Sequence, residues 1–447
     1  MYNEILKLIQ KYDKYIIEVY IEKTKTKRFR KRDLVIEDIS SNTSLGGQLR
    51  IYYKSSVLYA YFNDINKIEQ LLDSLVRHIE IYKNKKHDFH YEITDFNSIV
   101  LFNHTSNNNE NFEVAIDYIN NKMEILKNSC NLHLCVLNYG SIIKEKIYIN
   151  SLGSIIIQNF DDHSFNGAIF INKNKNIRHY SIASGGIALN EALERFEEQC
   201  NILKESYLTT LPIISINKDF YDIILDHESA GVFIHETIGH MSEIDTKAMD
   251  CDKFIKGGLI SNDLLNVNDD PSLDNYKGSY LFDDQGNLGR KTKIIEQGTF
   301  SNYLVDRRAN KLLGLPLTGN SRLVNFSHPP IVRMSNIFVK PGTGDVDNMI
   351  SSIKFGLYIR GVKSATTEGF KFRIVPNAAF VIKMGKIVGQ TNNIIITGNK
   401  ESLLSISDLS SNTKTNTGMF CSKENQRHLP VSVTAPAIRF KCRVEEF

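Results

Sequence analysis

Two histidines and a glutamate lie in one apolar stretch of the chain, and together they can form a hydrolytic metal site. The stretch is GVFIHETIGHM, which contains His235, Glu236 and His240. Two imidazoles can anchor Zn²⁺, a third protein ligand completes the set, and water takes the open position. A glutamate beside the first histidine can accept a proton from that water. The pattern therefore predicts a zinc-dependent hydrolase with Glu236 as general base.

The two histidines are five positions apart, one more than in the common zinc-binding helix. An α-helix turns by about 100° per residue, so side chains at this spacing point roughly 140° apart. A π-bulge absorbs one extra residue and would bring both imidazoles to the same side. Gly239 precedes the second histidine and weakens the regular helix there. We therefore predict a π-bulge between His235 and His240.

The spacing does not identify the third ligand. A distal carboxylate is the common choice in zinc peptidases. The candidates that the sequence offers are Glu243, Asp245, His227, Cys251, His428 and Cys421. The residue types alone leave these alternatives open.

Further motifs follow the histidine pair, and in their order they resemble those of the TldD/PmbA peptidase family. The family motif HExxGHxxExD stands here at 235–245. It is followed by FDDQG (282–286), TGNSR (318–322), PPIVRMSN (329–336), FGLYIRG (355–361) and CSKENQRHLPVSVTAPAIRF (421–440). The resemblance covers nearly the whole chain and is strongest from about residue 220 onward.

This resemblance implies the complete set of metal ligands. In the family a cysteine of the C-terminal segment binds the metal just before a GQxxPVxVxxP-like stretch, and Cys421 holds that position. The implied protein is a zinc metallopeptidase with His235, His240 and Cys421 as ligands and Glu236 as catalytic base. The other five cysteines are expected to be structural.

The resemblance also implies the supporting residues and the shape of the cleft. Glu243 and Asp245 are expected to orient the imidazoles, while Arg333 and Asn336 either hold substrate backbone or support the cleft. The chain departs from the family pattern at KSATTEGFKF (363–372) and around the ligand cysteine, where usual glycines are replaced. These departures favour a specialised substrate.

The expected activity is hydrolysis of unfolded peptides, with leader-peptide trimming during maturation of a ribosomal peptide natural product as one role. The family resemblance implies a homodimer, or a heterodimer with a metal-free TldE/PmbA-like paralogue. Two alternatives remain open. One is a non-catalytic scaffold subunit of a heterodimeric peptidase, and the other is a zinc hydrolase of a non-peptide amide.

The strands and helices that must position the site together predict an α+β protein. We expect an N-terminal α+β module at 1–100, a middle α+β module at 101–210, and a β-rich zinc peptidase domain at 211–447 around the HExxxH helix. Alternating apolar residues predict strands at 15–23, 33–39, 48–54, 57–62, 132–140, 145–151, 153–160 and 166–174, and helical spacing predicts helices at 64–83, 113–127 and about 188–206.

Composition narrows the class of protein and its compartment. The chain has 447 residues with a net charge of only +3, which gives no indication of an anionic partner. The basic run KTKTKRFRKRD (23–33) is interpreted as a solvated strand face, because no pattern of stacking aromatic residues accompanies it. Six dispersed cysteines argue against a disulfide scaffold. With no apolar run of membrane-spanning length, we expect a cytoplasmic protein without nucleic-acid or membrane partners.

Overall fold

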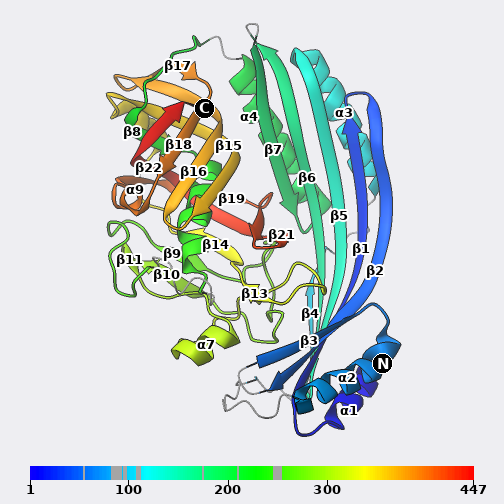
Figure 1. The fold of residues 1–447 in the computed structure, drawn as a ribbon. Coiled ribbons are helices and arrows are strands. Elements are labelled where there is room, and N and C mark those ends of the chain that lie inside the picture. Colours follow the sequence, from blue (N-terminus) through cyan, green and yellow to red (C-terminus); the bar gives the residue numbers. More distant parts are fainter. Residues whose placement is uncertain are drawn as a thin grey trace.

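The chain folds around two large β-sheets, flanked by helices (Figure 1). The computed structural model describes residues 1–53, 56–81, 93, 98–106, 112–173, 176–208, 211–244 and 254–446. Its mixed α+β architecture confirms the fold class predicted from the sequence. Within these ranges, no helix is long and apolar enough to cross a membrane.

The N-terminal sheet has seven strands, most of them long. In order across the sheet its strands are β3 (Ser56–Phe62), β2 (Val35–Tyr53), β1 (Ile16–Arg32), β5 (Leu132–Asn150) and β6 (Ile155–Lys173), and β6 also pairs with β4 (Ile99–His104) and β7 (Asn176–Gly186). The basic run belongs to β1, which pairs with β2 on one side and β5 on the other. Strands from 1–100 and from 101–210 therefore share one sheet. The division of the chain into folding units at residues 100 and 210 stays a prediction.

In the described part of the chain, four helices accompany this sheet, and their apolar residues pack in two clusters. They are α1 (Tyr2–Gln10), α2 (Ile68–Ile81), which follows the 3₁₀ turn Ile65–Lys67, α3 (Phe112–Ser129) and α4 (Leu189–Leu208). Buried residues of α1 and α2 pack on β1, β2 and β5, whereas those of α3 and α4 pack on β5, β6 and β7. The helices predicted at 113–127 and 188–206 are confirmed with small shifts at their ends, and the helix predicted at 64–83 is confirmed up to residue 81, since residues 82–83 lie outside the described ranges.

The C-terminal sheet has eleven strands and supports the predicted metal site. Its strands are β8 (Asp219–Leu225), β9 (Val267–Asp269), β10 (Thr292–Glu296), β11 (Thr299–Phe300), β14 (Asn336–Val339), β15 (Phe355–Glu368), β16 (Lys371–Lys383), β17 (Lys386–Thr391), β18 (Ile394–Gly398), β19 (Asp408–Asn416) and β22 (Ser432–Glu446). Two small pairs accompany it, namely β12 (Ser321–Arg322) with β13 (Ile331–Val332), and β20 (Phe420–Lys423) with β21 (Gln426–Pro430).

Short helices connect these strands. They are α5 (His227–Ile234), the π-helical turn His235–Gly239, α6 (His240–Ser242), α7 (Arg307–Leu313), α8 (Val346–Ser351) and α9 (Lys400–Leu404). Helix α5 packs on β22, β15 and β19, so the sheet forms a platform beneath the histidines.

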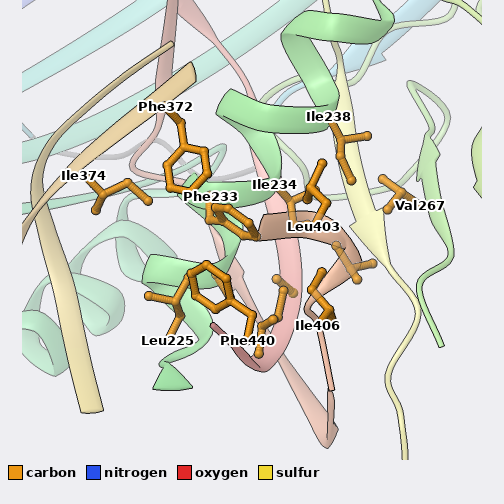
Figure 2. Packing of buried hydrophobic residues seen from close by; sticks show 14 of the residues in the cluster. Leu225, Phe233, Ile234, Ile238, Val267, Phe372, Ile374, Leu403, Ile406 and Phe440 are labelled. Carbon is orange, nitrogen blue, oxygen red and sulfur yellow. The ribbon is translucent and has the colours of Figure 1, made fainter. Parts of the chain in front are cut away.

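An aromatic and aliphatic core holds α5 on that platform (Figure 2). The ring of Phe233 lies 4.8 Å from that of Phe440 and 5.1 Å from that of Phe372, measured between centroids. Ile234 and Ile238 are also fully buried in this cluster. Each such side chain stabilises the packed state by about 1.5–3 kcal/mol through burial. The core thus fixes the helix that leads into the histidine pair.

The segment 280–306, whose sequence predicts a pair of strands with turns at Gly286, Gly289 and Gly298, forms strands only in part. Only β10 and β11 form strands, and Phe282 makes just an isolated bridge to Leu288. The carboxylate of Asp283 accepts hydrogen bonds from the backbone N–H groups of Gln285 and Asn287. Such local bonds compete with a strand ladder, and they stabilise a turn at this position.

Candidate metal centre

A capped helix start fixes the direction of α5. Asp226 is the N-cap residue, and its Oδ1 accepts a hydrogen bond from the backbone N–H of Ser229 at 2.8 Å. Its Oδ2 accepts from Gly361 N–H in β15 at 3.2 Å, which ties the same carboxylate to the sheet. One helix turn later, Gly231 faces Val433 of β22, where an added Cβ would lie 3.3 Å from a valine methyl. The helix therefore approaches the sheet closely.

A π-helical turn places the two histidines side by side. The backbone N–H of His240 donates to the carbonyl of His235, five residues earlier, and the turn spans His235–Gly239. The predicted π-bulge is thereby confirmed. The two imidazole centroids lie 4.9 Å apart with their planes at 81°. Gly239 also packs against Met334, whose Sδ would lie only 2.0 Å from an added Cβ.

Cys421 reaches the histidines from the other end of the C-terminal region. It lies on β20 and pairs with Leu429 of β21. Its Sγ is 3.6 Å from His240 Nε2. The donor atoms of His235, His240 and Cys421 all lie within 4.8 Å of one another. The structure therefore brings together the three side chains that the resemblance implied.

The charges around this cluster favour a thiolate. Burial alone would raise the pKa of the Cys421 thiol, but His240 and His235 beside it lower that pKa well below its usual value. Burial would likewise lower the pKa of His240, but Cys421 and Glu243 raise it well above its usual value. A cysteine binds metal as the thiolate. The cluster is thus arranged to hold Cys421 in the form that binds a metal.

The donor set fits a zinc ion. Imidazole nitrogen and thiolate sulfur are both zinc ligands, and three protein ligands leave the fourth position of a catalytic zinc site open for water. His235 and Cys421 are 2% and 1% exposed, so their polar atoms cannot be satisfied by bulk water. Within the described part of the chain, the buried Nδ1 of His235 has no hydrogen-bond partner. Such an orphaned nitrogen is unusual in a folded protein.

Glu243 holds the second histidine in place. Its Oε2 lies 3.0 Å from His240 Nδ1, and its Oε1 accepts a hydrogen bond from the backbone N–H of Met334 at 2.9 Å. Lys423 Nζ lies 3.1 Å from the same Oε2 and donates to the Val332 carbonyl at 3.0 Å. Burial would raise the pKa of Glu243, but Lys423 and His240 lower it. A carboxylate on the outer imidazole nitrogen fixes the tautomer that leaves Nε2 free for a ligand.

Sequence reasoning missed Lys423. It lies two positions after Cys421 on the same strand, and residues i and i+2 of a strand point to the same side. That alternation is the sequence signal that could have placed a cation beside the cysteine. It could not have indicated Glu243 as the partner, because the two residues meet only through tertiary packing.

The remaining candidates lie elsewhere or support the surroundings. His227 Nε2 lies 3.2 Å from Asn412 Oδ1, and His428 is exposed on β21, so neither joins the cluster. Asp245 and Cys251 lie outside the described residues. Glu236 directly follows His235 in the π-helical turn and is half-buried.

Arg333 and Asn336 are both fully buried near this region. The amide of Asn336 donates to the Asp270 carbonyl and to Ser279 Oγ at 3.0 and 2.8 Å. Arg333 Nη1 approaches the Gln426 carbonyl at 3.5 Å. These contacts favour a supporting role for both residues over direct contact with a substrate.

Comparison with known proteins identifies the family. Residues 218–445 match the PmbA/TldA metallopeptidase C-terminal domain, and residues 17–79 match PmbA/TldA metallopeptidase domain 1. A metalloprotease of Methanothermobacter thermautotrophicus is 31% identical over 317 residues, which cover 68% of each chain. The chain belongs to the PmbA/TldD metallopeptidase family. The enzyme class expected from the sequence is thereby confirmed.

Other relatives agree with this assignment to the PmbA/TldD family. A metalloprotease of Methanocaldococcus jannaschii is 28% identical over 370 residues, 80% of each chain. A protein of Saccharolobus solfataricus named zinc metalloprotease TldD homolog is 31% identical over 223 residues, covering 49% of this chain and 50% of that protein. The crystal structure of TldE from Thermococcus kodakarensis shares the fold, with a TM-score of 0.77 and 15% identity over 99% of both chains.

Proposed function

We propose that this PmbA/TldD family member is a zinc-dependent peptidase whose ion is held by His235, His240 and Cys421. The observation that carries the proposal is the approach of their three donor atoms to within 4.8 Å. The name of the Saccharolobus solfataricus relative, a zinc metalloprotease, supports zinc as the metal. The buried thiolate supports the same choice, because soft sulfur ligands favour zinc over magnesium or calcium.

Different residues have different roles in the proposed hydrolysis. Zinc, when bound, would supply a Lewis acid that polarises the scissile carbonyl and acidifies water. Glu236 takes the proton of the attacking water and passes it to the leaving amine. Glu243 and Lys423 keep His240 in one orientation through the Nδ1 contact of 3.0 Å. Because the Cys421 thiolate donates more charge than a neutral imidazole, water bound at this centre would be less acidic, and the base Glu236 matters more.

The substrate class that we propose is an unfolded peptide, bound in an extended conformation to the β-rich C-terminal domain. Strand β20, which carries Cys421, pairs within the described chain only with β21, so its second edge can receive a strand. Such pairing would lay the peptide backbone beside the metal cluster. Trimming of a leader peptide from a ribosomal natural-product precursor is the proposed role.

The proposed partner is a second family subunit, either another copy or a TldE/PmbA-like paralogue, acting in the cytoplasm. The likeness of the fold to TldE from Thermococcus kodakarensis supports a paralogue of similar shape. Mixing the purified chain with a co-encoded paralogue and measuring mass by light scattering would distinguish a homodimer from a heterodimer.

Two substitutions test the proposed centre. Glu236→Gln should abolish peptide hydrolysis and leave one zinc per chain, because it removes the base and no ligand. Cys421→Ser should release zinc during dialysis, as measured by elemental analysis. The matched controls are Glu368→Gln, at an exposed position, and Cys442→Ser, whose hydroxyl can still donate to the Thr397 carbonyl.

The outcomes separate the competing functions. Retained turnover in Glu236→Gln contradicts the assigned base, and zinc retention in Cys421→Ser contradicts the assigned ligand. A native chain without zinc would point to a scaffold subunit. A zinc-loaded chain that cleaves no member of an unstructured peptide library, with or without a paralogue, would point to a non-peptide amide as substrate.

A further inference from the structure

A cavity of about 390 Å³ lies at the seam between the two sheets. Strand β7 of the N-terminal sheet lines one side, and β15, β16 and β17 of the C-terminal sheet line the other. Its charged lining residues are Arg178 and Lys363, with His179 beside them, and no aspartate or glutamate among the described residues lines it. None of these residues belongs to the metal cluster. We call this cavity the seam site.

The acceptors that the described residues offer to the guanidinium of Arg178 are neutral. Nη1 donates to Gln390 Oε1 at 2.8 Å. The amide of Asn392, oriented to satisfy its neighbours, accepts from Nη2 at 3.3 Å. Nε is buried and has no acceptor among the residues that the structure describes. The side chain is thus held in position, and no carboxylate in the described ranges pairs with its charge.

Lys363 adds a second cation to the same cavity. It lies on β15, is half-buried, and forms no ion pair within the described ranges. Burial lowers its pKa, and the charge of Arg178 lowers it further. Two cations at one partly desolvated site repel each other, and an anion between them would relieve that cost.

The seam site is preformed by hydrogen bonds that cross between the sheets. Asn377 of β16 accepts from the backbone N–H of Ser181 at 2.9 Å and donates to the Ser181 carbonyl at 2.6 Å. Gln390 of β17 donates to the carbonyl of Ser206 in α4 at 3.1 Å, in addition to holding Arg178. These bonds fix both walls, so a ligand would enter with little rearrangement.

We propose that the seam site binds an oxyanion, either a phosphate or a carboxylate, through Arg178 and Lys363. The guanidinium suits such a group because its N–H donors match the geometry of two oxygens. Lys363 contributes a point charge from the opposite wall. His179 and the amides of the lining supply further polar surface around the ligand.

Calorimetric titration of the full-length protein tests this assignment with two probes. One is inorganic phosphate, and the other is an N-acetylated dipeptide with a free carboxylate, compared with its C-terminal amide. We expect saturable binding of at least one oxyanion with a Kd of about 1 mM. Preference for phosphate over the dipeptide carboxylate, or the reverse, identifies the source of the oxyanion.

Substitutions show whether that binding belongs to the seam site or to the metal centre. Lys363→Met and Arg178→Gln should each weaken it at least about tenfold. Lys363→Met is the safer variant, because no described hydrogen bond depends on Lys363. The matched controls are Lys383→Met and Arg373→Gln, at exposed positions of β16, and they should leave the Kd within about twofold. Absence of saturable binding, or equal losses in the controls, overturns the proposal.

Discussion

A buried carboxylate at the boundary between the N-terminal sheet and the C-terminal region should contribute several kcal/mol to the free energy of unfolding. Glu18 of β1 is fully buried. It pairs with Arg50 at 3.3 Å and with Arg307 of α7, and accepts hydrogen bonds from Tyr52 and Tyr148 at 2.9 and 2.6 Å. One carboxylate therefore compensates two buried guanidinium groups. It also links α7 to the N-terminal sheet.

Glu18→Gln keeps the shape of the side chain and removes its charge. Arg50 and Arg307 are 0% and 1% exposed at their side chains, so water cannot replace the lost counter-charge. Removing one partner of a buried pair costs about 3–5 kcal/mol. We therefore expect the free energy of unfolding to fall by about 3–5 kcal/mol, the range typical of such a loss.

Urea unfolding followed by circular dichroism measures this change, since the chain contains no tryptophan for fluorescence. The matched control is Glu69→Gln, because Glu69 forms an exposed pair with Lys11 at 3.8 Å. An exposed pair contributes at most about 1 kcal/mol. If Glu18→Gln were no more destabilising than Glu69→Gln, the boundary network would not have the role that its burial indicates.

Three further predictions concern the surroundings of the site. Lys423→Met should weaken zinc retention at least about tenfold in a chelator competition, because Glu243 loses its cation; unchanged retention contradicts this. Gly239→Ala places a Cβ 2.0 Å from Met334 Sδ and should cost about 1–3 kcal/mol in urea unfolding; native stability contradicts the close packing. Burial raises the pKa of the Glu228 carboxyl to about 8. The free energy of unfolding should therefore fall as the pH rises from about 5 to about 8. Glu228→Gln should reduce this fall, as measured by the change in melting temperature over the same pH range. An equal fall in the variant contradicts it.

The sign of the last effect follows from proton binding. With its pKa raised above the ordinary value, Glu228 holds its proton in the folded chain at a pH where the unfolded chain has lost it. Its contribution to stability is therefore complete below the unfolded pKa and is lost as the pH rises through about 8.

The sequence by itself determined the local half of the site. His235, Glu236 and His240 lie within one helical segment, so helix geometry alone predicts how their side chains relate. The five-residue spacing and Gly239 predicted the π-helical turn, and the structure contains it at His235–Gly239. Alternating apolar residues likewise predicted segments of β1, β2, β3, β5 and β6 in the N-terminal sheet, because alternation depends only on which face of a strand is buried.

Cys421 could not be predicted as a ligand from spacing, because 181 residues separate it from His240. Local periodicity carries no information about which distant segments meet. The family resemblance supplied the cysteine, and the fold places its Sγ 3.6 Å from His240 Nε2. The role of the three side chains as zinc ligands remains a proposal.

Only the tertiary structure determined which charged groups from distant segments lie close together. The pairing of β1 with both β2 and β5 joined the expected N-terminal modules into one sheet. The contact of Lys423 with Glu243, and the closeness of the cations Arg178 and Lys363 in the seam site, arise where separate segments exclude water together. The physical reason is that desolvation and charge pairing depend on the whole packed environment, whereas helix and strand periodicity depend on neighbouring residues alone.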